Sequence, residues 1–167
     1  MIQRTLALIL TLTALVLCLA ACRQQKSYLN DRRCEELMDD AVDQIPVTFG
    51  YDTFESDHLR YCFDDWEEAD DACLRYSIAS ENINEIGIFH SPTEEKAREI
   101  YEDCKEYLND LREEKSAFIA SYAAEELPKL ERAEVRRFGN YTVYAILSDD
   151  DRTLVFDTIE QALTPKK

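Results

Sequence analysis

The sequence predicts an α+β protein, a two-layer sandwich in which a four-stranded antiparallel sheet is covered by a long helix and a C-terminal helix. Apolar residues recur at helical spacing in several stretches and alternate with polar residues in others. The alternating stretches come in pairs that short turns can join. Strands paired in this way favour an antiparallel sheet, and the expected order of elements is α-ββα-ββα.

An N-terminal apolar run precedes the predicted domain and ends in Leu19-Ala20-Ala21-Cys22, the pattern of a lipobox. The run from Thr5 to Leu19 is too short to span a bilayer but has the length of a signal-peptide core. We therefore expect residues 1–21 to be a lipoprotein signal peptide and Cys22 to carry acyl chains. Such chains bind a membrane stably at about 0.8 kcal/mol per buried methylene. The alternative is an ordinary secretory signal followed by a chance cysteine.

The mature chain begins with a polar stretch, residues 22–29, which is expected to be a tether. A single domain over residues 30–163 follows. Its first helix is predicted to start at Asn30 or Asp31 as N-cap and to stop before Pro46. The next residues up to position 71 show no sustained period and predict an irregular segment.

Two strands are predicted next, one around Leu74 to Ile78 and one from Ile83 to Phe89. Ser91-Pro92-Thr93-Glu94 then combines an N-cap serine, a proline at the first helical position and a glutamate three residues on. This capping box predicts the start of the long helix. Its apolar stripe runs from Ala97 to Tyr122, with lysine and glutamate on the other face.

The last third of the domain repeats the strand, strand, helix order without repeating the sequence. A short helical turn is expected over Ala124 to Glu131, followed by strands over Val135 to Phe138 and Tyr141 to Leu147. Gly139-Asn140 predicts a tight hairpin between them, because glycine takes the positive φ of the first turn position. A final helix should begin with Ser148 as its cap and end at Pro165.

These residues resemble a known family. The segments on which the resemblance depends are Glu85-Ile86-Gly87-Ile88-Phe89, the long charged helix, Phe138-Gly139-Asn140-Tyr141-Thr142-Val143 and Ser148-Asp149-Asp150. Over about residues 30–163 they are similar to the lipoproteins of Gram-positive bacteria grouped as domain-of-unknown-function family 4358. The resemblance implies a lipid-anchored extracytoplasmic domain and adds no activity, cofactor or site residue.

The charge balance excludes some partners. The chain has a net charge of −16, and without residues 1–21 it keeps 18 basic residues against 35 acidic ones, a net charge of −17. Nucleic acid is therefore not an expected partner. Anionic headgroups repel such a surface, so membrane attachment should rest on acyl chains at Cys22. The mature length of 146 residues is also too short for a two-lobed solute-binding lipoprotein.

Four cysteines follow Cys22. An even number outside the cytoplasm suggests disulfides, and the preferred pairs are Cys34–Cys104, between two helices, and Cys62–Cys73. The alternative is that these cysteines are small buried hydrophobic residues. There is no CxxC motif, which argues against a thioredoxin-like role.

No catalytic motif is found. His58 and His90 lack the HExxH spacing of a zinc site, and a GxSxG elbow is absent. No metal and no cofactor is expected. The acidic stretch Asp64 to Asp71 lacks the glycine and spacing of an EF-hand loop, and Asp149-Asp150-Asp151 suits a helix start.

Two functions from different classes remain. The preferred one is a non-catalytic binding or accessory module at the cell surface, held at Cys22 and presented to an envelope protein or cell-wall partner. The alternative is a small carboxylate-dependent cell-wall hydrolase. That activity would require a cleft that holds two acidic groups about 5 to 9 Å apart, one of them in apolar surroundings.

Overall fold

A computed structural model describes residues 27–45, 51–53, 62–63 and 66–166, and it confirms the α+β class. The helices are α2 (Cys34–Val42), the 3-10 helix η1 (Trp66–Glu68), α4 (Glu94–Tyr122), α5 (Leu127–Glu131) and α6 (Asp149–Leu163). The strands are β1 (Tyr51–Thr53), β2 (Asp71–Ser77), β3 (Glu85–His90), β4 (Glu134–Phe138) and β5 (Tyr141–Ile146). The signal peptide and Cys22 lie outside the described residues.

The strands form one antiparallel sheet in the order β1-β2-β3-β5-β4. All four predicted strands are present, and the three-residue β1 adds a fifth at one edge. In the centre of the sheet, Ile88 of β3 pairs with Cys73 of β2 on one side and with Val143 of β5 on the other. The predicted hairpins β2–β3 and β4–β5 therefore lie side by side.

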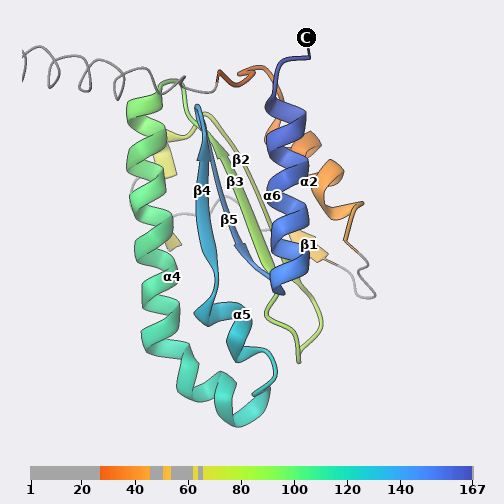
Figure 1. Ribbon diagram of the computed structural model, residues 1–167. Helices are drawn as coiled ribbons and strands as arrows, with labels where there is room; N and C mark the ends of the chain where they lie inside the picture. The colour runs from red at the N-terminus through yellow and green to blue at the C-terminus, as the bar shows by residue number, and fades with distance from the viewer. Residues whose placement is uncertain (1–26, 46–50, 54–61, 64–65, 167) are drawn as a thin grey trace, which may run out of the picture.

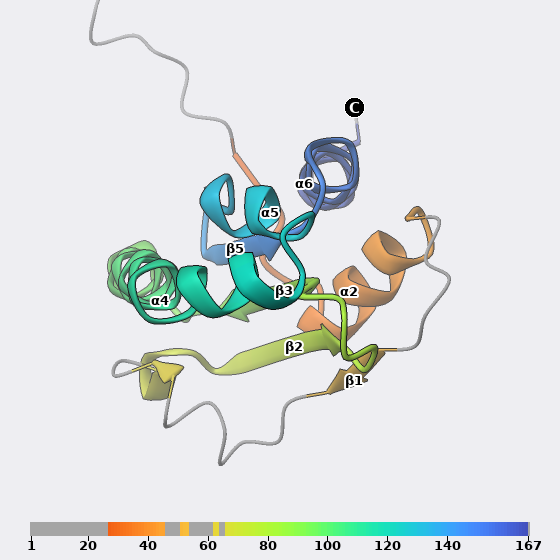
Figure 2. The same cartoon turned by 90° about the horizontal axis from the view of Figure 1, so that it is seen from below.

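The layers differ from the prediction. The long helix α4 packs on one face of the sheet, and α2 and α6 pack together on the other (Figure 1, Figure 2). The domain has three layers rather than two, because successive side chains of β3 and β5 point to opposite faces and both sets are apolar. Ile86 and Ile88 face α2 and α6, whereas Phe89 faces α4.

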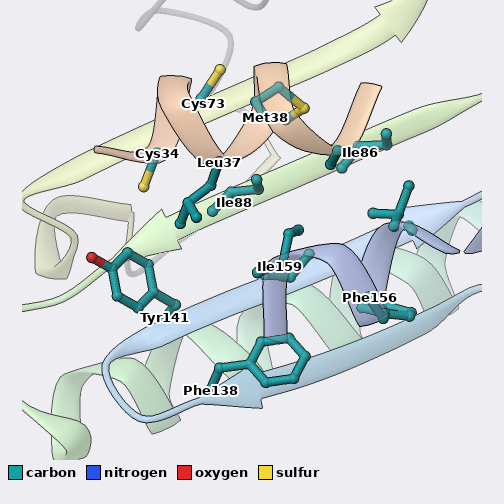
Figure 3. Close-up of a cluster of buried hydrophobic side chains, with 14 of the residues drawn as sticks. Cys34, Leu37, Met38, Cys73, Ile86, Ile88, Phe138, Tyr141, Phe156 and Ile159 are labelled. Carbon is teal, nitrogen blue, oxygen red and sulfur yellow. The ribbon is translucent and has the colours of Figure 1, made fainter. Parts of the chain in front are cut away.

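The core between α2, α6 and the sheet is made of buried side chains, most of them with no exposed surface (Figure 3). Leu37 and Met38 of α2 lie over Ile86 and Ile88, and Ile159 of α6 lies over the neighbouring strands. Burying a side chain of this size contributes about 1.5–3 kcal/mol. This second apolar layer explains why the C-terminal helix does not share a face with α4.

Helix α2 begins later than predicted, at Cys34 rather than after Asn30 or Asp31. No side chain at the preceding residue Arg33 caps it. Instead the carboxylate of Asp71, at the start of β2, accepts a hydrogen bond from the Cys34 amide at 2.7 Å. The cap comes from a residue 37 positions away, so local sequence patterns could not reveal it.

The start of α4 also differs from the prediction. Thr93, not Ser91, is the N-cap, and its side chain accepts a hydrogen bond from the Lys96 amide at 3.3 Å. Ser91 is held in the preceding turn, where its amide donates to Asn140 and its carbonyl accepts from the Asn140 side chain. Contacts with the β4–β5 hairpin therefore override the predicted capping box.

Two other local predictions are confirmed. Gly139 has a φ of +62°, as expected for the first turn position of the β4–β5 hairpin. Ser148 caps α6 by accepting a hydrogen bond from the Asp151 amide at 3.2 Å, and three acidic residues occupy the first turn. Their negative charges interact favourably with the positive end of the helix dipole.

The described start of the chain is fastened to the body by a set of contacts that we call the N-terminal clamp. Its members are Tyr28, Leu29 and Arg32. The Leu29 amide donates to the carbonyl of Leu163 at the end of α6, and the Tyr28 ring packs edge-on against Phe138. The Arg32 amide donates to the Tyr141 hydroxyl at 3.0 Å, and this hydroxyl donates to the Arg32 carbonyl at 2.7 Å.

Candidate functional site

An open groove of about 290 Å³ lies between the C-terminal half of α4 and the end of the β2–β3 hairpin, and we call it the α4 groove. Most of the residues that line it are apolar, namely Tyr76, Ile83, Leu111, Phe118, Ile119, Leu130 and Ile146. The polar residues of the lining are Ser77, Asn82, Asn84, Glu85 and Lys115. An apolar concavity with a few polar groups is the usual form of a binding site.

An exposed aromatic pair borders the α4 groove. The rings of Phe118 and Tyr122 stack with centroids 5.7 Å apart, and 63% of Phe118 and 54% of Tyr122 is exposed. Ile78, near the end of the β2–β3 hairpin, is 62% exposed. These three side chains account for most of the large exposed hydrophobic residues among the described part of the chain. An apolar surface of this kind marks an interaction site.

The sequence placed Phe118 and Tyr122 on the buried stripe of the long helix, and the structure corrects this. A helix of 29 residues is about 43 Å long, whereas a strand of six residues spans about 20 Å. The last turns of α4 therefore extend beyond the sheet, so only part of the stripe is covered. Comparing the predicted lengths of helix and strands could have located this surface.

The floor of the α4 groove contains a half-buried, hydrogen-bonded carboxylate, that of Glu85. Tyr107 and Tyr144, which we call the floor tyrosines, donate to the same oxygen, Oε1 of Glu85, at 2.8 and 2.5 Å. Burial and the neighbouring Glu85 charge raise the pKa of both floor tyrosines well above the ordinary value. Both hydroxyls therefore stay protonated and act as donors to the carboxylate.

Close packing fixes the floor. Gly87 of β3 lies against the Tyr144 ring, where any Cβ atom would collide with it. The side chain of Phe63 contacts the rings of Tyr107 and Tyr144, with centroids 4.8 and 5.9 Å away. The glycine of the Glu85 strand thus makes room for the ring that binds Glu85.

The rim of the groove beside α5 is held by an ion pair. Glu126 accepts hydrogen bonds from the Lys129 ammonium at 2.7 Å and from the Ile83 amide at 3.1 Å. Lys129 also donates to the Asn84 side chain at 2.9 Å. The side chains of Glu126 and Lys129 are only 10% and 17% exposed. These bonds join the β2–β3 hairpin to α5.

The four cysteines are free, and neither predicted bridge is present. Cys34 and Cys73 lie in the core beneath α2, whereas Cys104 and Cys62 pack on the α4 face. The sheet therefore separates Cys34 from Cys104 and Cys73 from Cys62, although a disulfide requires Cα atoms within about 7 Å. Burial raises the pKa of all four thiols. They fit the alternative that these cysteines are small buried hydrophobic residues.

The remaining polar candidates have structural contacts. His90 lies between the side chains of Asp70, 2.5 Å from Nδ1, and Asn30, 2.7 Å from Nε2, while His58 lies outside the described residues. In the acidic stretch, positions 64–65 are also outside them, Glu68 pairs with Lys96, and Asp71 caps α2. Across the described ranges, no group of histidine, cysteine and acidic residues is arranged to hold a metal ion.

The family model described as domain of unknown function (DUF4358) matches residues 53–147. The chain belongs to this family. The match covers β2, β3, α4, α5, β4 and β5, and so includes every element that lines the α4 groove. No curated protein and no solved structure matches the chain.

The part of this DUF4358 protein that the structure describes includes no helix long and apolar enough to cross a membrane. The predicted signal peptide and Cys22 precede these residues. Their roles as leader and lipid anchor stay predictions.

Proposed function

We propose that the protein is a lipid-anchored, extracytoplasmic binding module without catalytic activity, held at Cys22 and presenting the α4 groove to a partner. The observation that carries the binding role is the exposed pair Phe118 and Tyr122 beside an apolar groove. The lipobox at Cys22 supports the location.

The chemistry of the groove favours binding over hydrolysis. A carboxylate-dependent glycosidase requires two acids across the scissile bond, and the α4 groove is lined by one carboxylate, Glu85. That carboxylate accepts hydrogen bonds from two tyrosines, so its Oε1 atom is already engaged by groups of the protein itself. Glu126, the nearby acid, is engaged by Lys129.

The test is the intact mass and N-terminal sequence of the protein taken from the membrane fraction of its native host. We expect a mature chain that begins at Cys22 and carries a diacylglyceryl group. A Cys22→Ala variant should lose this mass and leave the membrane fraction. An unmodified Cys22 in the native chain would overturn the anchor.

The absence of catalysis is tested separately by incubating the mature chain with purified cell-wall glycan. We expect no release of reducing ends above that of a buffer control. Release that disappears in a Glu85→Gln variant would refute the binding-module proposal in favour of a hydrolase.

A further inference from the structure

We infer that the α4 groove docks a basic, amphipathic segment of an extracytoplasmic polypeptide, at the end of the domain that faces away from the membrane. This inference rests on the proposed function, because it takes Cys22 as the lipid anchor. It adds the direction in which the groove points and the chemistry of the partner.

The N-terminal clamp fixes which end of the domain lies near the anchor. Cys22 is six residues before Tyr28, and six residues span at most about 20 Å. Tyr28 packs on Phe138 and lies against Gly139, at the turn of the β4–β5 hairpin. The membrane-proximal end is therefore the end with this turn and the C-terminus of α6, the upper end in Figure 1.

The α4 groove lies at the opposite end. Helix α4 starts beside the same turn, where Arg137 donates to the Glu94 carbonyl at 3.3 Å. Phe118 is 24 residues further along the helix, which is about 36 Å. The groove is also lined by Ile146, the last residue of β5, whereas the β4–β5 turn lies just before the first residue of this strand. With the clamp toward the bilayer, the groove faces outward.

Tilting the domain onto α4 would bring the groove down to the bilayer, but the charge of that helix opposes it. The outer surface of α4 exposes eight acidic residues, Glu94, Glu95, Glu99, Glu102, Glu106, Asp110, Glu113 and Glu114. It exposes three basic residues, Arg98, Lys105 and Lys115. Anionic headgroups repel such a surface. A lipid surface is therefore not the occupant that the groove favours.

The size of the groove favours a polypeptide. A volume of about 290 Å³ lies at the lower limit of pockets that enclose whole small ligands, about 300–1,000 Å³. It suits one or two large side chains of a partner. The exposed rings of Phe118 and Tyr122 extend the apolar contact beyond the groove. A pocket for an anchor residue within a wider contact surface is typical of protein interfaces.

The charge around the groove favours a basic partner. Exposed acidic side chains near its ends are Glu81 on the β2–β3 hairpin, Glu114 on α4 and Glu125 after it. Lys115 is the exposed basic residue of the lining, and its ammonium lies 3.9 Å from the Glu114 carboxylate. The whole chain carries a net charge of −16. A partner with lysine or arginine around its apolar residues would be complementary.

The experiment uses the full mature chain from residue 22 with Cys22→Ser, which prevents acylation and changes no described residue. The ligand is a labelled helical peptide with leucine on one face and lysine on the other, and binding is followed by fluorescence anisotropy. We expect the peptide to bind, and a version with glutamate in place of lysine not to bind. Phe118→Ser should weaken binding at least about tenfold, the effect of losing an interface anchor.

Leu154→Ser is the matched control, because Leu154 is 39% exposed on α6, across the sheet from the groove. It should bind the peptide like the unchanged chain. Failure of the peptide to bind, or equal binding by Phe118→Ser, would overturn the inference.

Two further results would assign the groove to another occupant and also overturn the inference. One is that the protein sediments with vesicles of phosphatidylcholine and phosphatidylglycerol and that Phe118→Ser abolishes this sedimentation. The other is a dimer that Phe118→Ser dissociates. Failure of the proposed anchor would instead appear in the mass of Cys22, so the two failures are distinguishable.

Discussion

Replacing Tyr144 by phenylalanine tests the buried floor of the α4 groove. The change removes one hydroxyl from a fully buried residue and keeps its ring, so it opens little space. The lost hydrogen bond, 2.5 Å long, is to the Glu85 carboxylate. Hydrogen bonds to charged groups contribute about 1.5–3 kcal/mol, and we expect Tyr144→Phe to lower the free energy of unfolding by about 2 kcal/mol.

The assay is urea unfolding of the mature chain at neutral pH, with Tyr107→Phe as the comparison. Tyr107 donates to the same Glu85 oxygen at 2.8 Å but is less buried, so water can replace its hydroxyl more easily. We expect Tyr107→Phe to lower the free energy of unfolding by about 1 kcal/mol. A change below about 0.5 kcal/mol for Tyr144→Phe, or a larger effect at Tyr107, would refute this description of the floor.

Three other predictions concern capping, thiols and alkaline pH. Asp71→Ala should lower the free energy of unfolding by about 1 kcal/mol in the same urea titration, because α2 loses its cap. Asp31→Ala changes the exposed residue that was predicted to cap α2, and it should alter the free energy of unfolding by less than about 0.5 kcal/mol. Native peptide mapping after thiol alkylation should find no disulfides among the described cysteines, with Cys62 alkylated faster than fully buried Cys104; a bridged peptide would contradict the structure. The floor tyrosines have raised pKa values, so above about pH 10 the unfolded chain releases protons that the folded chain retains, and stability should fall by about 1.4 kcal/mol per pH unit for each tyrosine; a tyrosinate absorbance that rises before unfolding and is lost in Tyr107→Phe or Tyr144→Phe would contradict this.

Much of the fold could be predicted from periodicity and turn chemistry. The two hairpins, the long helix and the Gly139 turn are determined by neighbouring residues, and the structure confirms them. The start of α2 could not be predicted in this way, because its cap, Asp71, comes from another element. The number of layers was also mispredicted. Over a few residues, the pattern of a strand that is buried on both faces is hard to distinguish from that of a strand buried on one face.

The candidate site was harder to predict than the fold. Residues of the α4 groove come from α4, α5, three strands and the turn between β2 and β3, and no motif marks them. Phe118 follows the same period as the buried residues of α4, so spacing alone assigns it to the core. Its exposure depends on where the sheet ends, which is a property of the assembled domain. The cysteine pairing failed for the same reason, because Cys34 and Cys104 each suit a buried helix face but not the same side of the sheet.

The N-terminal clamp also determines how the domain responds to mechanical force. In a chain anchored at Cys22, tension applied by a bound partner reaches the fold first at Tyr28, Leu29 and Arg32. The Tyr141 hydroxyl is hydrogen-bonded to both the amide and the carbonyl of Arg32, so both bonds must break before this part of the chain separates from the sheet. Strand β5, which carries Tyr141, lies inside the sheet between β3 and β4. A pull on the anchor is therefore passed to the interior strand β5 through Tyr141, as well as to the edge strand β4 through the contact of Tyr28 with Phe138.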